Sequence, residues 1–520
     1  MLDAGTWPSR AFRLWPLDHY GCRCLENPAI IFFAAAMLFN SAQFIFVFLP
    51  IVLSVFFLLG RLREQMLAVM WLVAASLVFY GFDDPYRLLP LILASIAFNF
   101  FVGRMLLRSQ NRVLLAIGVG GDLLLLGYFK YAGFLVETLN AVTGIALPKP
   151  NIDLPIGISF FTFTQIAFLV DAYRAEAREY EPFHYALFVS FFPHLIAGPI
   201  YHHKEIMPQF HLQENFRFDI SNFGFGLTWF ALGLAKKILF ADVVAQYATP
   251  IFNAAAAGQA VGLVDSWIGV CGFALQLYYD FSGYSDMAIG LALMIGVRLP
   301  LNFDSPYKAL SLVDFWRRWH MTLSRFLRDY LYIPLGGNRK GPRRRYINLL
   351  VTMLLGGLWH GAAWTFVIWG AIHGFGLVVN HAWNKVTASY PLKLPDPIAW
   401  ALTLGFVMVA WVPFRADSLA ATFTIWKGMF GFHGLVPTES VIAARVTTAV
   451  ICIAVLLAVA LFAPNTQQLL SYPRVIIAAF RQPIRFVPSP RWAIAAGIVF
   501  GIAVSFIITQ RPTEFLYFRF

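Results

Sequence analysis

The chain has 520 residues, of which 59% are hydrophobic and only 13% are charged, against the roughly one quarter typical of soluble domains. The formal net charge of +12 does not indicate a nucleic-acid partner, because the basic residues stand mostly in short links between long apolar runs. The composition therefore excludes an ordinary soluble enzyme and favours a membrane protein. Neither a zinc site nor a disulfide framework is expected from the four cysteines, Cys22, Cys24, Cys271 and Cys452.

The first 36 residues differ from the rest of the chain. They are mixed and polar, show no helical period, and lack the order of charged start, apolar run and cleavage site that marks a signal peptide. Met37 opens a sequence that reads like a natural start. We interpret residues 1–36 as an extension, either disordered or produced by a misassigned start codon, and residues 37–520 as a single transmembrane domain.

From residue 44 onward, apolar runs follow one another along the chain. A spanning helix needs about 20 largely apolar residues, and several of these runs are shorter or interrupted, as in re-entrant or interfacial segments. The pattern predicts an all-α, polytopic membrane fold with roughly ten to twelve spans. The runs cover about 44–60, 65–81, 88–107, 113–128, 154–170, 184–200, 223–241, 261–279, 284–297, 346–358, 364–380, 398–413, 446–462 and 492–508.

Charges between the runs indicate the orientation. Arg61 and Arg63 follow the first run, and Asp83 and Asp84 follow the second. Because positively charged links face the cytoplasm, the first span is expected to begin on the opposite side. By the same rule, the tail 511–520 is expected outside. The cytoplasmic side is expected to hold the basic link 339–345 and the links that carry Arg108, Arg112, Arg474, Arg481, Arg485 and Arg491.

The densest polar stretch lies at residues 314–330. Read as one helix, it has Trp316, Trp319 and Leu323 on one face and arginines on another, which is typical of a membrane interface. The arginines suit an interfacial anchor as well as they suit the binding of phosphate groups. The candidate substrate contacts in and after this stretch are Trp316, Arg317, Arg318, Trp319, Ser324 and Trp359.

His360 has a different setting. It follows apolar residues that include Gly356 and Gly357, which permit close backbone approach, and Gly361 is expected to break the helix behind it. An ionisable residue at membrane depth is costly, so it usually faces a cavity and serves a function. The alternative is a histidine that only forms a hydrogen bond between helices, and that interpretation is the stronger one for His373.

Two carboxylates interrupt another apolar region. Asp280 and Asp286 stand six residues apart in the stretch 276–286. They either form helix-to-helix hydrogen bonds around a Gly-Tyr turn or take part directly in a site. The first interpretation is slightly favoured, and both residues remain candidate substrate contacts.

A third polar stretch, residues 193–200, contains His194 between two prolines and reads as a broken, re-entrant helix. Together with His202 and His203 it indicates a metal site only weakly, because no carboxylate or cysteine completes a familiar ligand spacing. We therefore expect no metal. The sequence also shows no internal repeat of the kind from which transporters with inverted halves are built.

Seven short motifs stand in order along the chain, at Leu154–Phe163, Gly233–Lys237, Tyr279–Asp286, Trp319–Ser324, Leu331–Asn338, Gly357–Gly361 and Trp411–Ala416. In this order they resemble the membrane-bound O-acyltransferase family, and within it the bacterial branch that acetylates alginate. Any one motif is weak, but seven in order are specific. The likeness runs from about Met37 to the end of the chain, and it does not explain the N-terminal extension.

The resemblance implies a helical fold around a thin centre, with a tunnel that links the two membrane faces. It makes His360 the counterpart of the family's active-site histidine and His320 the counterpart of its second frequent polar position. It also implies acetyl-CoA as a cytoplasmic donor, without a bound cofactor. The expected location is the bacterial inner membrane, and the expected partners are membrane lipid, a periplasmic acetyltransferase or esterase-like protein of the SGNH type, and the complex that makes and exports the polysaccharide.

Acyl transfer would give the buried histidine a definite task. A neutral imidazole can accept the proton of a hydroxyl that adds to a thioester carbonyl, and such a general base typically contributes about 10²–10⁴-fold to the rate. Burial favours the neutral imidazole. His320 would orient the acceptor, stabilise the oxyanion or act as the second member of a proton relay.

The expected function is O-acetylation of an exported polysaccharide, with alginate as the best single guess. The same branch also serves peptidoglycan and cellulose acetylation, and a related branch transfers D-alanine to teichoic acids. A transporter that uses His320 and His360 as a proton relay is the alternative from another class. A scaffold for a secretion complex is a remote third.

Overall fold

A computed structural model describes residues 37–82, 84–177, 179, 181–389, 394–435, 446–471, 489–509, 513, 515 and 516. Several features named above lie outside these residues, namely the extension 1–36, Asp83, Arg474, Arg481, Arg485 and, apart from Thr513, Phe515 and Leu516, the tail. Within the described residues the regular structure is helical, which confirms the all-α prediction.

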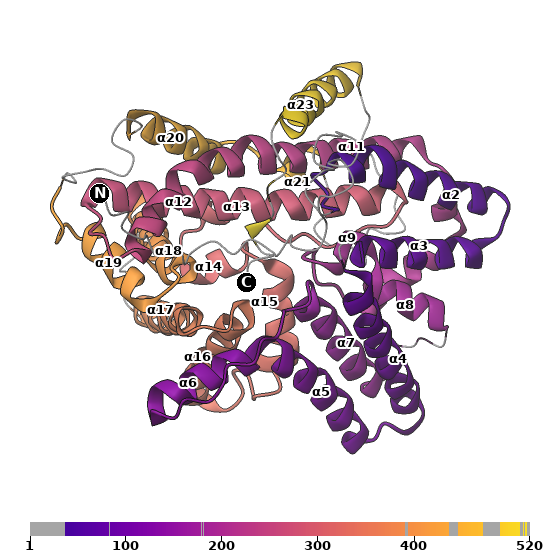
Figure 1. Cartoon of the computed structure of the whole chain (residues 1–520), viewed down its shortest axis with the longest axis horizontal. Coiled ribbons are helices and arrows are strands. Elements are labelled where there is room, and N and C mark those ends of the chain that lie inside the picture. Colours follow the sequence, from indigo (N-terminus) through magenta and orange to yellow (C-terminus); the bar gives the residue numbers. More distant parts are fainter. Residues whose placement is uncertain are drawn as a thin grey trace, which may run out of the picture.

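Most of the N-terminal helices lie on one side of the molecule, whereas α6 extends toward the opposite side (Figure 1). Their starts follow local signals, since the Asp84 side chain accepts a hydrogen bond from the Arg87 amide and Asn111 caps the next helix through the Val113 amide. A π-helical turn, Gly127–Tyr131, joins α5 to α6. The helices are α2 (Leu49–Arg61), α3 (Gln65–Tyr80), α4 (Pro85–Ser109), α5 (Arg112–Leu126), α6 (Ala132–Thr143), α7 (Ile158–Tyr173), α8 (Pro182–Ser190), α9 (Phe192–Leu195) and α10 (His203–Ile206).

The long helix α13 (Leu263–Met294) lies at the centre and packs on α11 (Ile220–Ala235) and α12 (Asp242–Ala256). Small residues allow this close packing: a Cβ on Gly233 would lie 2.6 Å from the Gly283 carbonyl oxygen, and one on Gly226 would lie 2.5 Å from that of Gly290. The two apolar runs predicted at 261–279 and 284–297 are thus one helix. The turn expected around Gly283 and Tyr284 is absent, because α13 continues through it.

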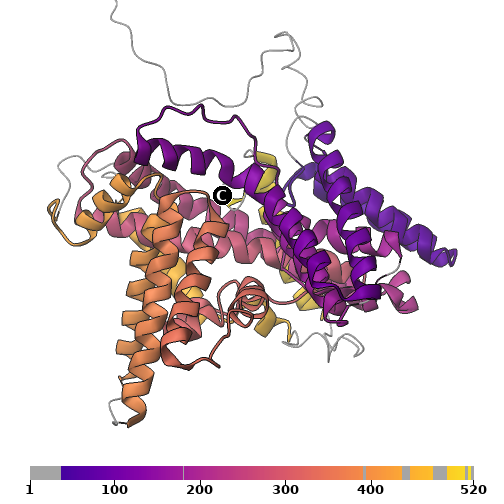
Figure 2. The same ribbon diagram turned by 90° about the horizontal axis from the view of Figure 1, so that it is seen from below.

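Helices α16 to α19 lie on the other side of the molecule, as Figures 1 and 2 both show, whereas α23 lies over α11. Here α16 and α17 pack as a hairpin, and α18 lies against α17. The helices are α14 (Leu312–Trp316), α15 (Met321–Leu327), α16 (Gly341–His360), α17 (Trp364–Ser389), α18 (Asp396–Arg415), α19 (Leu419–Met429), α20 (Val446–Phe462), α21 (Thr466–Leu469) and α23 (Pro490–Thr509).

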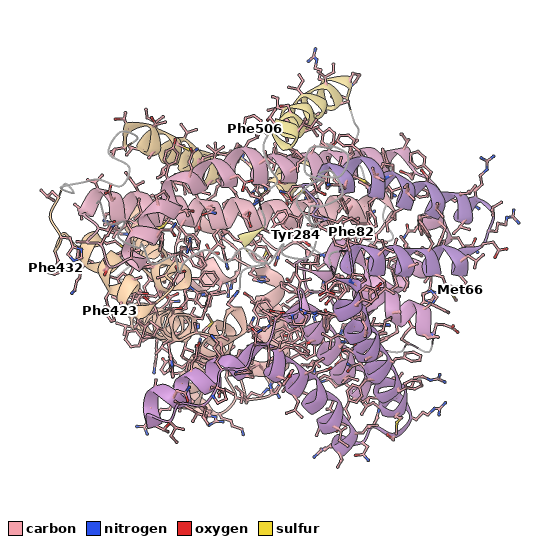
Figure 3. The ribbon with its side chains drawn as sticks, viewed as in Figure 1. Met66, Phe82, Tyr284, Phe423, Phe432 and Phe506 are labelled. Atoms are coloured by element: carbon pink, nitrogen blue, oxygen red, sulfur yellow. The ribbon has the colours of Figure 1, made fainter. Side chains whose placement is uncertain are left out.

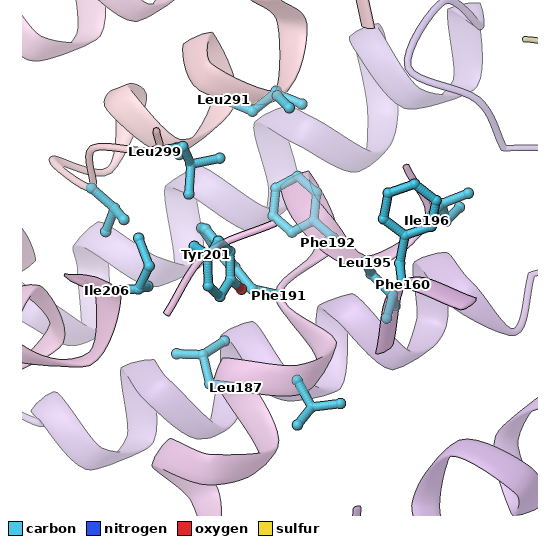
Figure 4. Packing of buried hydrophobic residues seen from close by; sticks show 14 of the residues in the cluster. Phe160, Leu187, Phe191, Phe192, Leu195, Ile196, Tyr201, Ile206, Leu291 and Leu299 are labelled. Atoms are coloured by element: carbon cyan, nitrogen blue, oxygen red, sulfur yellow. The ribbon is translucent and has the colours of Figure 1, made fainter. Parts of the chain in front are cut away.

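The segment 191–201 is broken, as predicted: α9 has only four residues, and an irregular stretch follows it. Its apolar side chains fill the interior between the N-terminal helices and the end of α13 (Figure 4). Phe191, Phe192 and Leu195 are at most 2% exposed. The break is therefore part of the tightly packed core.

Six helices among the described residues are long and apolar enough to cross a membrane, and three shorter apolar helices accompany them. The predicted count of ten to twelve spans is not confirmed. Large hydrophobic side chains are exposed around the periphery, where Figure 3 shows Phe423 and Phe432, while Tyr284 lies in the interior. Such an apolar surface suits contact with lipid.

Candidate functional site

His360 is the last residue of α16. The helix ends there because Gly361 adopts an extended backbone, as the sequence predicted. Gly357 lets α17 approach, since a Cβ on it would lie 2.3 Å from the Phe366 carbonyl oxygen. The imidazole is buried, at 4% exposure, and its ring centroid lies 5.1 Å from that of Trp369 on α17. Close helix packing thus presents this histidine to an aromatic interior.

His320 stands between α14 and α15 in a left-handed backbone conformation, with φ 41° and ψ 52°. A residue other than glycine is costly there and persists only where its surroundings enforce it. Here the loop at residues 302–304 does so: the Met321 amide donates to the Asn302 carbonyl, and the Asp304 amide donates to the Arg318 carbonyl. The prediction of one helix over 314–330 is therefore wrong.

The fold brings the two histidines together. The ring centroids of His320 and His360 lie 6.2 Å apart with planes inclined by 57°, and both side chains are buried. The Trp359 ring lies beside both, with centroids 6.1 Å from His320 and 5.0 Å from His360. Phe281 of α13 packs edge-on against His320 at 4.7 Å. Two ionisable rings thus share one aromatic enclosure.

The contacts of Asn302 assign the tautomer of His320. Asn302 Oδ1 lies 3.0 Å from His320 Nδ1 and accepts the Thr322 hydroxyl proton at 2.9 Å. That hydroxyl accepts a hydrogen bond from the Ile200 amide, so its own proton points at Asn302. Because an amide oxygen only accepts, His320 Nδ1 must donate, which leaves the lone pair on Nε2. Nε2 can therefore act as a proton acceptor.

Lys130 is a residue that sequence reasoning missed. Its ammonium, on the π-helical turn after α5, donates to the Trp359 carbonyl at 2.5 Å, to the His360 carbonyl at 3.4 Å and to Ser159 Oγ at 3.2 Å. The neighbouring Tyr131 hydroxyl donates to the Leu358 carbonyl. These carbonyls end α16 and have no helical partners, so the lysine both caps the helix and fixes His360. A lysine interrupting an apolar sequence was the available signal.

The predicted tryptophans make mainly aromatic contacts. Trp359 stacks on Phe163 at 5.2 Å, and its backbone carbonyl accepts from Lys130. Trp319 is buried and stacks on Phe315, and Trp316 donates a hydrogen bond to His373 Nδ1. Trp359 thus touches the histidine pair, whereas Trp316 contacts α17 and Trp319 packs on Trp411 of α18.

The polar candidates of the same stretch have other surroundings. Arg318 forms an ion pair with Asp314 at 2.9 Å, and Arg317 is exposed. Ser324 Oγ donates to the Trp319 carbonyl at 3.4 Å. These contacts account for Arg318 and Ser324 without a ligand, so phosphate or substrate binding by Arg317, Arg318 and Ser324 stays a prediction.

Asp280 and Asp286 face a pair of lysines on the π-helical segment Lys236–Ala241. Lys237 lies 2.7 Å from Asp280, and Lys236 lies 2.6 Å from Asp286. Asp286 also accepts the Thr466 hydroxyl proton. These contacts give both carboxylates a structural role between helices. They agree with the favoured interpretation of the sequence, although no turn is involved.

The three histidines of the broken segment have separate partners. His194 uses both ring nitrogens, one 2.8 Å from the Pro199 carbonyl oxygen and the other 3.1 Å from Thr164 Oγ1. His202 contacts the Tyr330 hydroxyl, and His203 contacts Glu179. Among the residues that the structure describes, no group of three or more His, Cys, Asp or Glu side chains is arranged to hold a metal ion.

Comparison with known proteins places this site in a family. Residues 156–419, which include both histidines, match the membrane-bound O-acyltransferase family model. The chain is 42% identical to the "Peptidoglycan O-acetyltransferase" of Helicobacter pylori, over 77% of this chain and 81% of that protein. It is also 42% identical to the "Probable alginate O-acetylase AlgI" of Pseudomonas aeruginosa, over 76% of this chain and 75% of that protein.

A more distant relative carries a different acyl group in its name. The chain is 28% identical to the "Teichoic acid D-alanyltransferase" of Streptococcus thermophilus, over 48% of this chain and 64% of that protein. Despite their different names, all three relatives are acyltransferases. The matched region, the apolar helices and the two near relatives together show that the chain is a multi-pass membrane O-acyltransferase and belongs to the membrane-bound O-acyltransferase family.

Proposed function

We propose that this protein transfers acetyl groups from a cytoplasmic donor, across the inner membrane, for O-acetylation of an exported polysaccharide. The observation that carries the proposal is the enclosed pair of histidines, whose ring centroids lie 6.2 Å apart. Two buried imidazoles in one aromatic enclosure suit a reaction that moves a proton in a space with little water.

In the proposed reaction an acceptor hydroxyl adds to the carbonyl of an acetyl thioester. The hydroxyl proton passes to His360, the acetyl C–S bond breaks, and the departing thiolate takes a proton to become a thiol. His320, whose tautomer puts the lone pair on Nε2, accepts a hydrogen bond from the acceptor hydroxyl and orients it. Lys130 is a positioning residue, because it acts on His360 through the backbone carbonyls.

The proposed donor is acetyl-CoA. The basic stretch at residues 339–345 runs into the first turn of α16, and by the positive-inside rule it faces the cytoplasm. His360 ends that helix, whose 20 residues correspond to a length of about 30 Å at helical rise. This length supports a placement of the histidine away from the cytoplasmic face, where a donor from one side would meet an acceptor from the other.

The acceptor polymer is proposed as alginate first and peptidoglycan second, with cellulose as a further possibility. The two near relatives are equally similar at 42% identity, so overall similarity does not choose between the first two. In either case we propose that a periplasmic protein of the SGNH type takes the acetyl group and works with the export complex. Genes next to this one would discriminate: alginate polymerisation genes, a cellulose synthase, or a lone esterase.

The test is purified protein in proteoliposomes, supplied on the cytoplasmic face with acetyl-CoA labelled in the acetyl group. We expect label on the lumenal side only when the periplasmic partner is present, and none with His360→Ala. His320→Ala should also be severe, and a partial loss would fit a positioning role. Normal acetylation by His360→Ala would overturn the catalytic proposal. Proton or substrate flux without acyl transfer would favour the transporter, and a scaffold predicts that both substitutions are silent.

A further inference from the structure

Two hollows adjoin at the end of α2, far along the chain from the histidines. One has a volume of about 540 Å³ and is almost entirely apolar; the other has a volume of about 1010 Å³. Three residues line both hollows, namely Ser54, Phe57 and Phe218. The two hollows are therefore neighbours, one of them the apolar part and the other the polar part of a pair, and these three residues stand at their junction.

The polar part carries positive charge. Arg61, Arg63 and Arg217 line it and are exposed, and none of its lining residues is acidic. Within the described residues, none of the three is held in an ion pair, although Glu64 and Glu214 stand nearby in sequence. Guanidinium groups bind phosphate oxygens with paired, charge-assisted hydrogen bonds. The three arginines thus suit a phosphate group.

The apolar part extends away from the arginines between three helices. It is lined by residues of α2, α11 and α23, among them Leu53, Leu227 and Phe500. Of these helices, α23 packs on α11 and lies over it, and α2 closes the hollow from the other side of its lining (Figure 1). A soluble phosphate compound would leave this apolar part empty, whereas an acyl chain would fill it.

Close packing fixes the residues that line the two hollows. The segment 213–218 lies tightly on the end of α2, because a Cβ on Gly60 would be 1.9 Å from the Phe216 carbonyl oxygen. Phe57 and Phe218 meet edge-on at 5.4 Å where the two parts join. Arg63 has a left-handed backbone, with φ 65°, at the turn after α2. The arginines are thus carried by a closely packed turn.

The place of the arginines in the chain indicates the membrane face at which they lie. Arg61 and Arg63 end the first apolar run, so the positive-inside rule puts them at the cytoplasmic surface. The cytoplasmic leaflet carries anionic lipids, which attract basic residues at the surface. From these observations we propose that the joined hollows bind one anionic phospholipid of the inner leaflet, with its phosphate among Arg61, Arg63 and Arg217 and an acyl chain between α2, α11 and α23.

The test is native mass spectrometry of the full chain in detergent, with added phosphatidylglycerol or with phosphatidylcholine of the same acyl chains. We expect one phosphatidylglycerol to bind at least about tenfold more tightly than phosphatidylcholine. The triple variant R61Q/R63Q/R217Q should lose this preference. A matched variant, R339Q/R343Q/R344Q, removes three exposed arginines elsewhere and should keep it.

A second variant tests the apolar part. Ser54→Trp fills the junction and leaves the three arginines in place, so it should weaken phosphatidylglycerol with long chains and spare the dihexanoyl form. Equal binding of the two headgroups would overturn the proposal, as would an undiminished preference in R61Q/R63Q/R217Q. Displacement of the lipid by millimolar inorganic phosphate would also overturn it, because it would identify a plain phosphate site.

Discussion

Two of the buried polar regions among the described residues differ in how their charged or ionisable groups are partnered. Between α13 and the segment 236–241, each carboxylate meets a lysine: Asp280 meets Lys237 and Asp286 meets Lys236. At the end of α16, two imidazoles face a shared aromatic enclosure, and the lysine beside them contacts backbone carbonyls. The matched charges of the first region join helices, whereas the paired imidazoles of the second are the residues for which we propose a chemical role.

The same contrast separates the histidines. His194 is as buried as His360, but both of its ring nitrogens contact fixed protein oxygens. On His320 one nitrogen is held by Asn302, and the tautomer leaves a lone pair on the other. Burial alone therefore does not identify a site. The arrangement of hydrogen bonds around each ring does.

The largest expected effect is the loss of acetyl transfer in His360→Gln. If this ring is the general base, transfer of label in proteoliposomes should fall by about 10²–10⁴-fold. His194→Gln is the matched control, because it removes an equally buried ring outside the pair; its activity per folded protein should stay within a few-fold of the wild type. Equal losses in the two variants would erase the distinction between structural and chemical histidines.

The ion pairs of α13 should matter for stability. Lys237 is 1% exposed and contacts both Asp280 and Asp242. Lys237→Met would leave the buried Asp280 carboxylate without its cation, which typically costs about 3–5 kcal/mol. We expect a clearly lower midpoint of thermal unfolding in detergent.

The control for that stability effect is an exposed pair. Lys204 and Glu176 lie 2.9 Å apart with side chains that are 44% and 45% exposed, so Lys204→Met should cost at most about 1 kcal/mol. If Lys237→Met unfolded at the same midpoint temperature as the wild type, the carboxylates of α13 would not depend on this lysine. The structural role that we assign to these ion pairs would then be wrong.

Asn302 tests the tautomer of His320. Asn302→Leu would leave the buried Nδ1–H without an acceptor, at a cost of about 1–3 kcal/mol, and we expect kcat to fall by a corresponding factor of roughly 5–150. Asn302→Asp keeps an acceptor oxygen and should retain most of the activity at equal stability. If both variants lost activity only in proportion to unfolding, Asn302 would be a packing residue and nothing more.

The smallest expected effect is that of Lys130→Met. A hydrogen bond from a charged donor is worth roughly 1.5–3 kcal/mol, but Lys130 acts on His360 only through the backbone, so we expect the lower end of that range to appear in catalysis, a loss of acetyl transfer of about tenfold. Lys149→Met, which removes a lysine paired with Glu137 at the exposed end of the same region, should have little effect. Unchanged transfer in Lys130→Met would show that the carbonyl contacts do not position His360.

Local sequence determined much of this protein. The apolar runs required helices because lipid leaves no other partner for backbone groups, and Gly361 ended α16 at His360 because it adopts an extended backbone there. Close packing at Gly357 also followed from its lack of a side chain. These features depend on neighbouring residues, so periodicity and residue type suffice to predict them.

Only the tertiary structure decided what the polar residues do. Lys130 reaches a carbonyl 230 positions away, and the Ile200 amide fixes a hydroxyl 122 positions away that in turn orients Asn302. The break before His320 likewise depends on backbone partners supplied by residues 302–304. Hydrogen bonds between distant segments leave no periodic mark in a sequence, because each needs only a donor and an acceptor that the fold brings within about 3 Å.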